Sequence, residues 1–287
     1  MTTSWVTAAG AELAGALDDF VEQGGTPGGV VAVGEAGGAT EVVSAGIIAP
    51  ECGAVPPGAD TIYDVASLTK VIATWPLAGF AVRSGRLDLD APVRTYLPDL
   101  PSGVALPGAV VTARQLLAHT SGLMRPTRLD RYRGSDRHLA ELILAEPLDH
   151  PPGERHEYIS RGYILLGLVL PKLLDQASLA DAARSLVWEP AGMTSTAFGP
   201  VGRTPRVAPT ERYFRGAPPV WGQAHDENAR LLGGEAGHAG AFSSAADLAR
   251  FAHWLLAPTC PLAAWLQDSI VPQVTLPERD GDLPPTE

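Results

Sequence analysis

The segment Ser67-Leu68-Thr69-Lys70 places a hydroxyl and an amine three residues apart. Because residues three apart share one face of a helix, Ser67 Oγ and Lys70 Nζ can meet there. A serine hydroxyl is a poor nucleophile unless a neighbouring base accepts its proton. A lysine removed from water is disfavoured in its charged form, so it can serve as that base. The pair therefore predicts acyl transfer through a serine nucleophile.

The position of Ser67 in the chain strengthens this interpretation. An apolar, β-prone run at residues 61–66 precedes it, and apolar residues at helical spacing follow over residues 68–82. Backbone N–H groups at the start of a helix lack intrahelical partners, and such groups can stabilise an oxyanion. The four-residue pattern alone is weak, because a solvated serine and lysine on a helix surface would look the same.

Tyr158 and Ser160, within residues 156–167, form a second candidate group. A tyrosine near a lysine loses its proton more easily and can relay protons to a leaving group. A core tyrosine at the start of a helix would give the same pattern, so this group needs support from other segments.

The composition favours a folded globular protein. The 287 residues are 45% hydrophobic and 18% charged, and a chain of this length can bury a large core. The formal net charge of −11 argues against nucleic acid as a partner, because binding to phosphates depends on lysine and arginine. The two cysteines, Cys52 and Cys260, are too few to suggest a disulfide scaffold or a zinc site.

The chain also shows no targeting signal. The first five residues lack a basic region followed by an apolar one. No stretch is long and apolar enough to predict a membrane span. We therefore expect a cytoplasmic protein with no membrane partner.

The elements that must position these residues fall into two groups. Near the N-terminus, residues 8–22 predict an amphipathic helix, and residues 30–34 and 41–46 predict a β-hairpin. Helical patterns then dominate from residue 88 to about residue 232. Helices are expected at residues 111–119 (opened by Thr112), 137–145, 162–174 and 178–188.

Three further sequence features predict a kink, the start of a helix and an irregular tail. Pro76 lies inside the helical pattern that follows Ser67 and should kink it. Ser244, with Asp247 three residues later, resembles a capping box that opens a helix running to residue 256. The acidic, proline-rich residues 277–285 predict a linker-like or frayed tail.

Taken together, several segments resemble the β-lactamase-related serine hydrolases. This family includes class C β-lactamases, low-molecular-weight penicillin-binding proteins, D-aminopeptidases and similar esterases, and S-x-x-K is its signature. The matching segments follow the family's order, and they are residues 64–70, 85–93, 116–123, 158–167, 225–229 and 237–251. Several matches in the right order are far more specific than S-x-x-K alone.

The resemblance implies an α+β fold and a site. An antiparallel sheet flanked by helices, from residues 1–85 and 233–287, would carry a mostly helical insertion at residues 86–232. In the cleft between the two parts, Ser67 would be the acylated nucleophile and Lys70 its proton acceptor. Tyr158 would assist departure of the leaving group, and the Ser67 backbone N–H would form half of an oxyanion hole. The resemblance implies a small-molecule acyl substrate and neither a cofactor nor a metal.

Two features depart from the family pattern. The family usually has Tyr-x-Asn where this chain has Tyr158-Ile159-Ser160, so Ser160 would meet a substrate with one hydroxyl instead of an amide. The third family motif is Lys-Thr-Gly or His-Thr-Gly on a strand facing the serine. In this chain only residues 238–240 resemble it, and the resemblance is superficial. Residues after 240 show no alternating strand pattern. We therefore expect the C-terminal strands that carry this motif to be missing.

Missing strands would have two consequences. They would leave a sheet edge and an apolar face exposed, which a partner chain or an oligomer could complete. Losing one oxyanion donor typically costs about 10²–10³ in rate, so a catalytically silent binding or sensing module is the alternative hypothesis. The leading hypothesis is a serine hydrolase or acyltransferase acting on an ester, amide or β-lactam-like substrate.

Other chemistries fit less well. The chain has no G-x-S-x-G, which argues against an α/β-hydrolase, and no H-E-x-x-H, which argues against a zinc hydrolase. We interpret His119, His225 and His238 as structural, because a histidine beside serine and glycine in a turn usually bonds to backbone groups.

Overall fold

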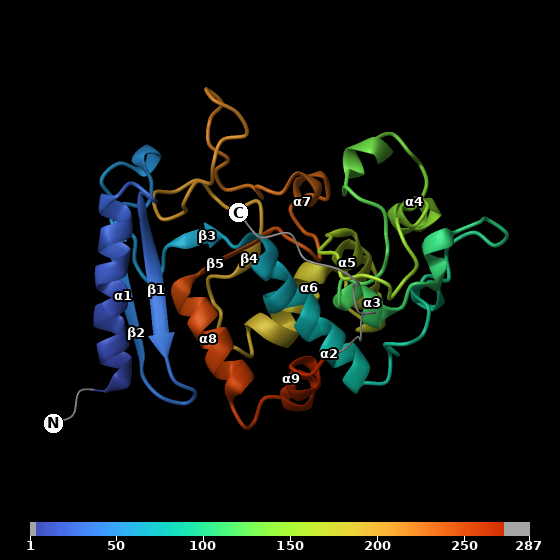
Figure 1. The fold of residues 1–287 in the computed structure, drawn as a ribbon, viewed down its shortest axis with the longest axis horizontal. Helices are drawn as coiled ribbons and strands as arrows, with labels where there is room; N and C mark the ends of the chain where they lie inside the picture. The colour runs from blue at the N-terminus through green and yellow to red at the C-terminus, as the bar shows by residue number, and fades with distance from the viewer. Residues whose placement is uncertain (1–3, 273–287) are drawn as a thin grey trace, which may run out of the picture.

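The N-terminal part of the chain forms a helix packed on a β-hairpin. The computed structural model describes residues 4–272. Helix α1 (Trp5–Glu22) lies along the antiparallel strands β1 (Gly28–Gly34) and β2 (Thr40–Gly46) at one end of the molecule (Figure 1). The predicted helix and hairpin are confirmed.

A separate three-stranded antiparallel sheet lies next to the Ser67 segment. Its order is β3 (Ile62–Asp64), β5 (Ala241–Ser244) and β4 (Ala197–Phe198), so β5 is the central strand. All four residues of β5 are buried. A strand buried on both faces has no alternating pattern, and the sequence therefore indicated only a helix start there. The expectation that no strand follows residue 240 is wrong for residues 241–244.

Helices fill most of the remaining structure. The predicted helices at residues 111–119 and 137–145 are present in shorter form, and the helix predicted at residues 162–174 is present one residue earlier. The fourth predicted helix continues from α6 into a π-helical turn at Arg184–Trp188. Thr112 opens α3 with a capping box to Gln115, as predicted. The helices after the hairpin are α2 (Trp75–Arg83), α3 (Ala113–Leu117), α4 (Leu139–Ala145), α5 (Arg161–Leu173), α6 (Leu179–Ala183), α7 (Glu227–Leu231), α8 (Ala245–Leu256) and α9 (Ala263–Ser269).

The segment after Ser67 changes helix type instead of kinking within one helix. A 3-10 turn at Ala66–Leu68 leads into a π-helical turn at Lys70–Thr74, and α2 begins only at Trp75. Pro76 therefore lies in the first turn of an α-helix, where a missing N–H is tolerated because that group has no intrahelical partner. The proline marks the start of α2.

Helix α5 runs through the main hydrophobic core. Its residues Leu165, Leu166 and Leu170 are fully buried, and they belong to the same core as Ile72 and Leu77. Full burial of such a side chain is worth about 1.5–3 kcal/mol. Helix α5 contacts α2, α3, α4 and α6 (Figure 1). Its packing fixes the preceding segment, which carries Tyr158 and Ser160, beside the π-helical turn.

Two sequence predictions bear on the limits of the fold. Within residues 4–272, no helix is both long and apolar enough to span a bilayer. The predicted frayed tail at residues 277–285 lies outside the described residues.

Candidate active site

Ser67 lies on a tight, strained turn between β3 and the π-helical turn. Ala66 has φ +45°, a left-handed conformation that costs an alanine roughly 1–2 kcal/mol. Asp64 Oδ1 accepts a hydrogen bond from the Ala66 N–H at 2.8 Å, and the Thr69 hydroxyl donates to the Ala66 carbonyl at 2.6 Å. These two bonds hold the turn in a shape that leaves Ser67 exposed. Within the described residues, the Ser67 N–H makes no hydrogen bond.

The same turn is fixed to β5 on both sides of Ser67. The Val65 N–H donates to the Ala241 carbonyl at 3.0 Å, and the Ala241 N–H donates to Thr69 Oγ1 at 3.1 Å. Strand β5, which the sequence did not predict, therefore supports the turn that carries Ser67. Asp64 Oδ2 adds a bond from the His225 N–H at 2.7 Å, which ties the turn to the loop before α7.

Lys70 reaches Ser67 as the three-residue spacing predicts. Its Nζ lies 2.9 Å from Ser67 Oγ and 3.0 Å from the backbone carbonyl oxygen of His238. The lysine is only 4% exposed, and its amine lies 4.9 Å from the ring centroid of Tyr158 and 5.6 Å from that of Tyr163. The amine is therefore enclosed by the Ser67 hydroxyl, two aromatic rings and one carbonyl.

Tyr158 joins this pair from the segment before α5. Burial raises the pKa of Tyr158, but hydrogen bonding to Lys70 and Ser67 and the charge of Lys70 outweigh burial, so the pKa is lowered overall. The residue as a whole remains 57% exposed, and it lines a surface cleft. The structure therefore brings together three of the predicted site residues, Ser67, Lys70 and Tyr158.

Ser160, the fourth predicted residue, lies in an adjacent cleft. It occupies the position before α5, and within the described residues its side chain makes no hydrogen bond to Lys70. With Tyr158 it lines a cleft of about 800 Å³, to which Arg125 and Asn228 also contribute. Ser160 therefore faces this cleft and not the lysine.

His119 is part of the site although sequence analysis assigned no chemistry to it. Its ring centroid lies 4.4 Å from that of Tyr158 and 5.1 Å from that of Tyr163. Its Nδ1 accepts a hydrogen bond from the Ile159 N–H at 3.3 Å. Burial lowers the pKa of His119 to about 4, and the charges of Lys70 and His156 act in the same direction. A neutral imidazole therefore packs against Tyr158. In the sequence, the only indication that His119 belongs to the site is its place in the family-like segment 116–123.

Residues 238–240, the superficial candidate for a third motif, lie on the other side of Lys70. His238 is 1% exposed, and it presents its backbone carbonyl to Lys70 while its side chain bonds to Asp226. In the part of the chain that the structure describes, no group of three or more metal-ligating side chains could hold an ion.

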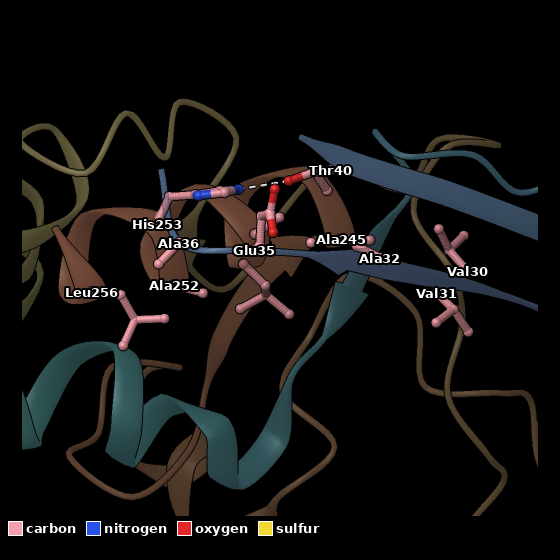
Figure 2. A pocket seen from close by; sticks show the side chains of 13 residues that line it. Val30, Val31, Ala32, Glu35, Ala36, Thr40, Ala245, Ala252, His253 and Leu256 are labelled. Carbon is pink, nitrogen blue, oxygen red and sulfur yellow. Dashed lines mark hydrogen bonds between the residues drawn. The ribbon is translucent and has the colours of Figure 1, made fainter. Parts of the chain in front are cut away.

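A second hollow lies between β1 and α8 (Figure 2). It measures about 500 Å³ and is largely apolar, with Val31, Leu248 and Leu256 among its lining residues. A hydrogen bond of 2.6 Å between Thr40 and His253 crosses one end of it. Within residues 4–272, β1 pairs only with β2, so its other edge is unpaired along this hollow, which we name the β1–α8 groove.

The fold and the serine–lysine–tyrosine cluster together define a protein of the β-lactamase/transpeptidase type. The family model described as Beta-lactamase matches residues 13–284, so the chain belongs to the β-lactamase family.

Known relatives and solved structures agree with this assignment. Relatives called putative D-alanyl-D-alanine carboxypeptidase are 30% identical in Escherichia coli (strain K12) and 28% identical in Salmonella agona (strain SL483). Each match covers 66% of this chain and 49% or 50% of the relative, so the chain spans about half the length of the curated relatives it matches.

Two solved structures share the fold. A penicillin-binding protein from Bacillus halodurans superposes with a TM-score of 0.69 at 21% identity, covering 91% of this chain and 79% of that one. A D-alanine carboxypeptidase AmpC from Burkholderia cenocepacia superposes with a TM-score of 0.66 at 24% identity, covering 89% and 67% respectively.

Proposed function

We propose that this chain is a serine hydrolase or acyltransferase that forms an acyl-enzyme at Ser67. The observation that carries the proposal is the contact of Lys70 Nζ with Ser67 Oγ at 2.9 Å, in a buried position against the Tyr158 ring. A nucleophile, a base and a proton relay within reach of one another are the parts that acyl transfer requires.

The chemistry proceeds in two steps. Ser67 Oγ attacks the acyl carbon while its proton passes to Lys70, and the resulting oxyanion accepts a hydrogen bond from the Ser67 N–H. The bond to the leaving group then breaks, and the leaving group takes a proton relayed from Lys70 through Tyr158. Water or another acceptor attacks the acyl-enzyme in the second step, releases the acyl group and restores the Ser67 hydroxyl.

The substrate class follows from the cleft beside Tyr158. We propose a small acyl compound, an ester or an amide, held by Ser160 and the polar groups of the cleft. Because curated relatives are called putative D-alanyl-D-alanine carboxypeptidase, an acylated D-alanyl-D-alanine peptide is the first amide to test beside a simple ester. Ser160 offers a single hydroxyl where the related Tyr-x-Asn motif offers an amide. We therefore expect weak β-lactam hydrolysis, and efficient nitrocefin turnover would contradict that expectation.

We also propose that an extended polypeptide segment completes the sheet at the β1–α8 groove. Unpaired strand edges attract further strands because their N–H and C=O groups lack partners. An added strand would present apolar side chains to Leu248 and Leu256. The two solved structures of the same fold are longer than their matched parts, so chains of this fold can carry additional segments.

A fluorophosphonate probe tests the proposed function directly. We expect it to label the protein at Ser67, as mapped by mass spectrometry, and we expect Ser67→Ala to abolish labelling. Equal labelling of both proteins would overturn the proposal. Ester turnover that Lys70→Ala abolishes would exclude the silent binding module, the alternative from the sequence.

A further inference from the structure

The amine of Lys70 needs a defined orientation if it is to accept a proton. A neutral lysine amine has two N–H groups and one lone pair, and only the lone pair can take the Ser67 proton. The His238 carbonyl oxygen, 3.0 Å from Nζ, accepts one N–H. In the structure the amine donates to Ser67 Oγ at 2.9 Å. In the neutral amine, the bond to the His238 carbonyl would limit rotation and leave the lone pair free to face Ser67 Oγ.

The position of this carbonyl depends on the residue that carries it. The His238 imidazole is almost completely buried, and its Nε2 lies 2.8 Å from Asp226 Oδ1. A carboxylate oxygen accepts, so Nε2 carries the proton. Within the described residues, Nδ1 is buried and has no hydrogen-bond partner. Among the described residues, the hydrogen bond to Asp226 is therefore the only one that the imidazole makes.

Asp226 is itself anchored by a helix. It is the N-cap of α7, and the same Oδ1 accepts the Ala229 N–H at 2.7 Å. The first turn of α7 thus fixes the Asp226 carboxylate, which is hydrogen-bonded to the His238 imidazole. The backbone carbonyl of His238 in turn accepts a hydrogen bond from Lys70.

The backbone beside His238 is tightly packed on its other side. The Gly237 carbonyl accepts a bond from the Thr74 hydroxyl at 2.6 Å. A Cβ added at Gly237 would lie 2.0 Å from the Tyr163 carbonyl oxygen. This side of the loop is fixed by backbone packing, and the side that faces α7 is fixed by the imidazole.

We propose that Asp226 and His238 form a positioning pair that orients Lys70 for proton transfer. The inference rests on the proposed role of Lys70 as the base. The pair touches neither the substrate nor Ser67; it acts through the His238 carbonyl. Its loss should slow the chemical step and leave ligand binding unchanged.

The test measures kinact and KI separately for fluorophosphonate labelling of Ser67. Asp226→Ser keeps a good N-cap for α7 but is too short to reach His238. We expect Asp226→Ser and His238→Ala each to lower kinact by about 10-fold to 100-fold, as small misplacements of catalytic groups do, with KI changed by less than about 2-fold. We expect kinact of the double variant to be no lower than that of either single variant, because both substitutions remove the same Asp226–His238 hydrogen bond.

Two comparison variants separate positioning from a general structural effect. Asp226→Asn retains an amide oxygen for the Nε2 proton and a good N-cap, so we expect it to restore most of the kinact lost in Asp226→Ser. Asp18→Ser makes the same substitution at an exposed residue of α1, and we expect wild-type kinact.

The outcomes distinguish the two proposals. Wild-type kinact in Asp226→Ser, or a rise in KI that accounts for the whole loss, would overturn the positioning pair. If His238→Ala does not fold, the comparison of kinact between Asp226→Ser and Asp226→Asn tests the positioning pair. Absence of labelling in the wild-type protein would overturn the proposed function itself.

Discussion

The site residues depend on one another through short contacts around one buried amine. Lys70 contacts Ser67, His238 and the rings of two tyrosines. His119 stacks on the Tyr163 ring and lies at a tilt against the Tyr158 ring. A charged imidazole next to Lys70 would be unfavourable, and it would lose Nδ1 as the acceptor for Ile159. The environment of His119 therefore favours its neutral form.

This preference links His119 to stability at acid pH. The pKa of His119 is lowered from 6.5 to about 4 by burial and by Lys70 and His156. Between these values the unfolded chain binds more protons at this position than the folded chain, so stability is lost as the pH falls through that window. His119→Phe keeps an aromatic ring and removes the titration. We expect the variant's free energy of unfolding to fall less than that of the wild type over that window, as measured by urea unfolding at several pH values.

His119→Phe should also lower the free energy of unfolding by an amount that does not depend on pH. Leaving the Ile159 N–H without its acceptor costs about 1–3 kcal/mol, and this loss should be visible near neutral pH. Wild type and variant share every other titrating group, so their difference isolates His119. Equal losses of stability between neutral and acid pH would contradict the prediction.

At the scale of elements, the junction of β5 and α8 joins the sheet to the helices. Ser244 caps α8 by accepting the Asp247 N–H at 3.2 Å, as the sequence predicted. The Asp247 carboxylate is fully buried and accepts bonds from the Ser195 N–H at 2.7 Å and the Thr196 hydroxyl at 2.8 Å. One side chain therefore holds the start of a helix against the segment that leads into β4.

Asp247→Ala should destabilise this junction. The Ser195 N–H and the Thr196 hydroxyl would lose their acceptor in a buried place, which we expect to lower the free energy of unfolding by about 2–4 kcal/mol. Urea unfolding followed by circular dichroism measures this loss.

Asp181 provides a matched control. Asp247 pairs with Arg250 at 2.6 Å, three residues later. Asp181 occupies the corresponding position in α6, where Ser178 is the N-cap, and it pairs with Arg184, also three residues later, but at the surface. We expect Asp181→Ala to lower the free energy of unfolding much less than Asp247→Ala does, because exposed ion pairs contribute little to stability. Equal losses in the two variants would show that the buried bonds of Asp247 contribute nothing beyond the helix start.

At the scale of the whole molecule, the hairpin end and the site are joined by α8. Helix α8 borders the β1–α8 groove and follows β5, the strand that anchors the Ser67 turn (Figure 1). A strand added beside β1 would therefore contact the helix that follows the strand supporting Ser67.

A peptide of alternating valine and threonine is a suitable probe for this addition. Ala252 is exposed and lines the groove (Figure 2), so Ala252→Glu would place a charge among apolar groups. We expect the wild-type chain to bind the peptide with slower hydrogen exchange in β1, and we expect Ala252→Glu to weaken binding by about 10-fold or more, since burying a charge is costly.

The control is Ala11→Glu, which adds the same charge at an exposed alanine of α1 outside the groove. We expect it to bind the peptide like the wild type. Failure of the wild type to bind, or equal weakening by both substitutions, would contradict strand addition at β1.

Local patterns predicted much of the fold. The α1–hairpin unit, the caps at Thr112 and Ser244 and the helices α3, α4 and α5 were all expected, because periodicity and capping depend on residues close in sequence. The short elements β5 and α7 were not, because they form through tertiary contacts that outweigh a weak local pattern. The predicted boundaries between the sheet part and the helical insertion stay a prediction.

The sequence by itself determined the contact of Ser67 with Lys70, because a three-residue spacing brings two side chains together within one turn. It also determined the family, through several segments in a fixed order. The tertiary structure decided which distant groups surround that pair. Packing of α5 places Tyr158 and the support of His119 on one side of the amine, and the loop between α7 and β5 places the His238 carbonyl on the other. No local pattern encodes such contacts, because they join segments that meet only when the core forms.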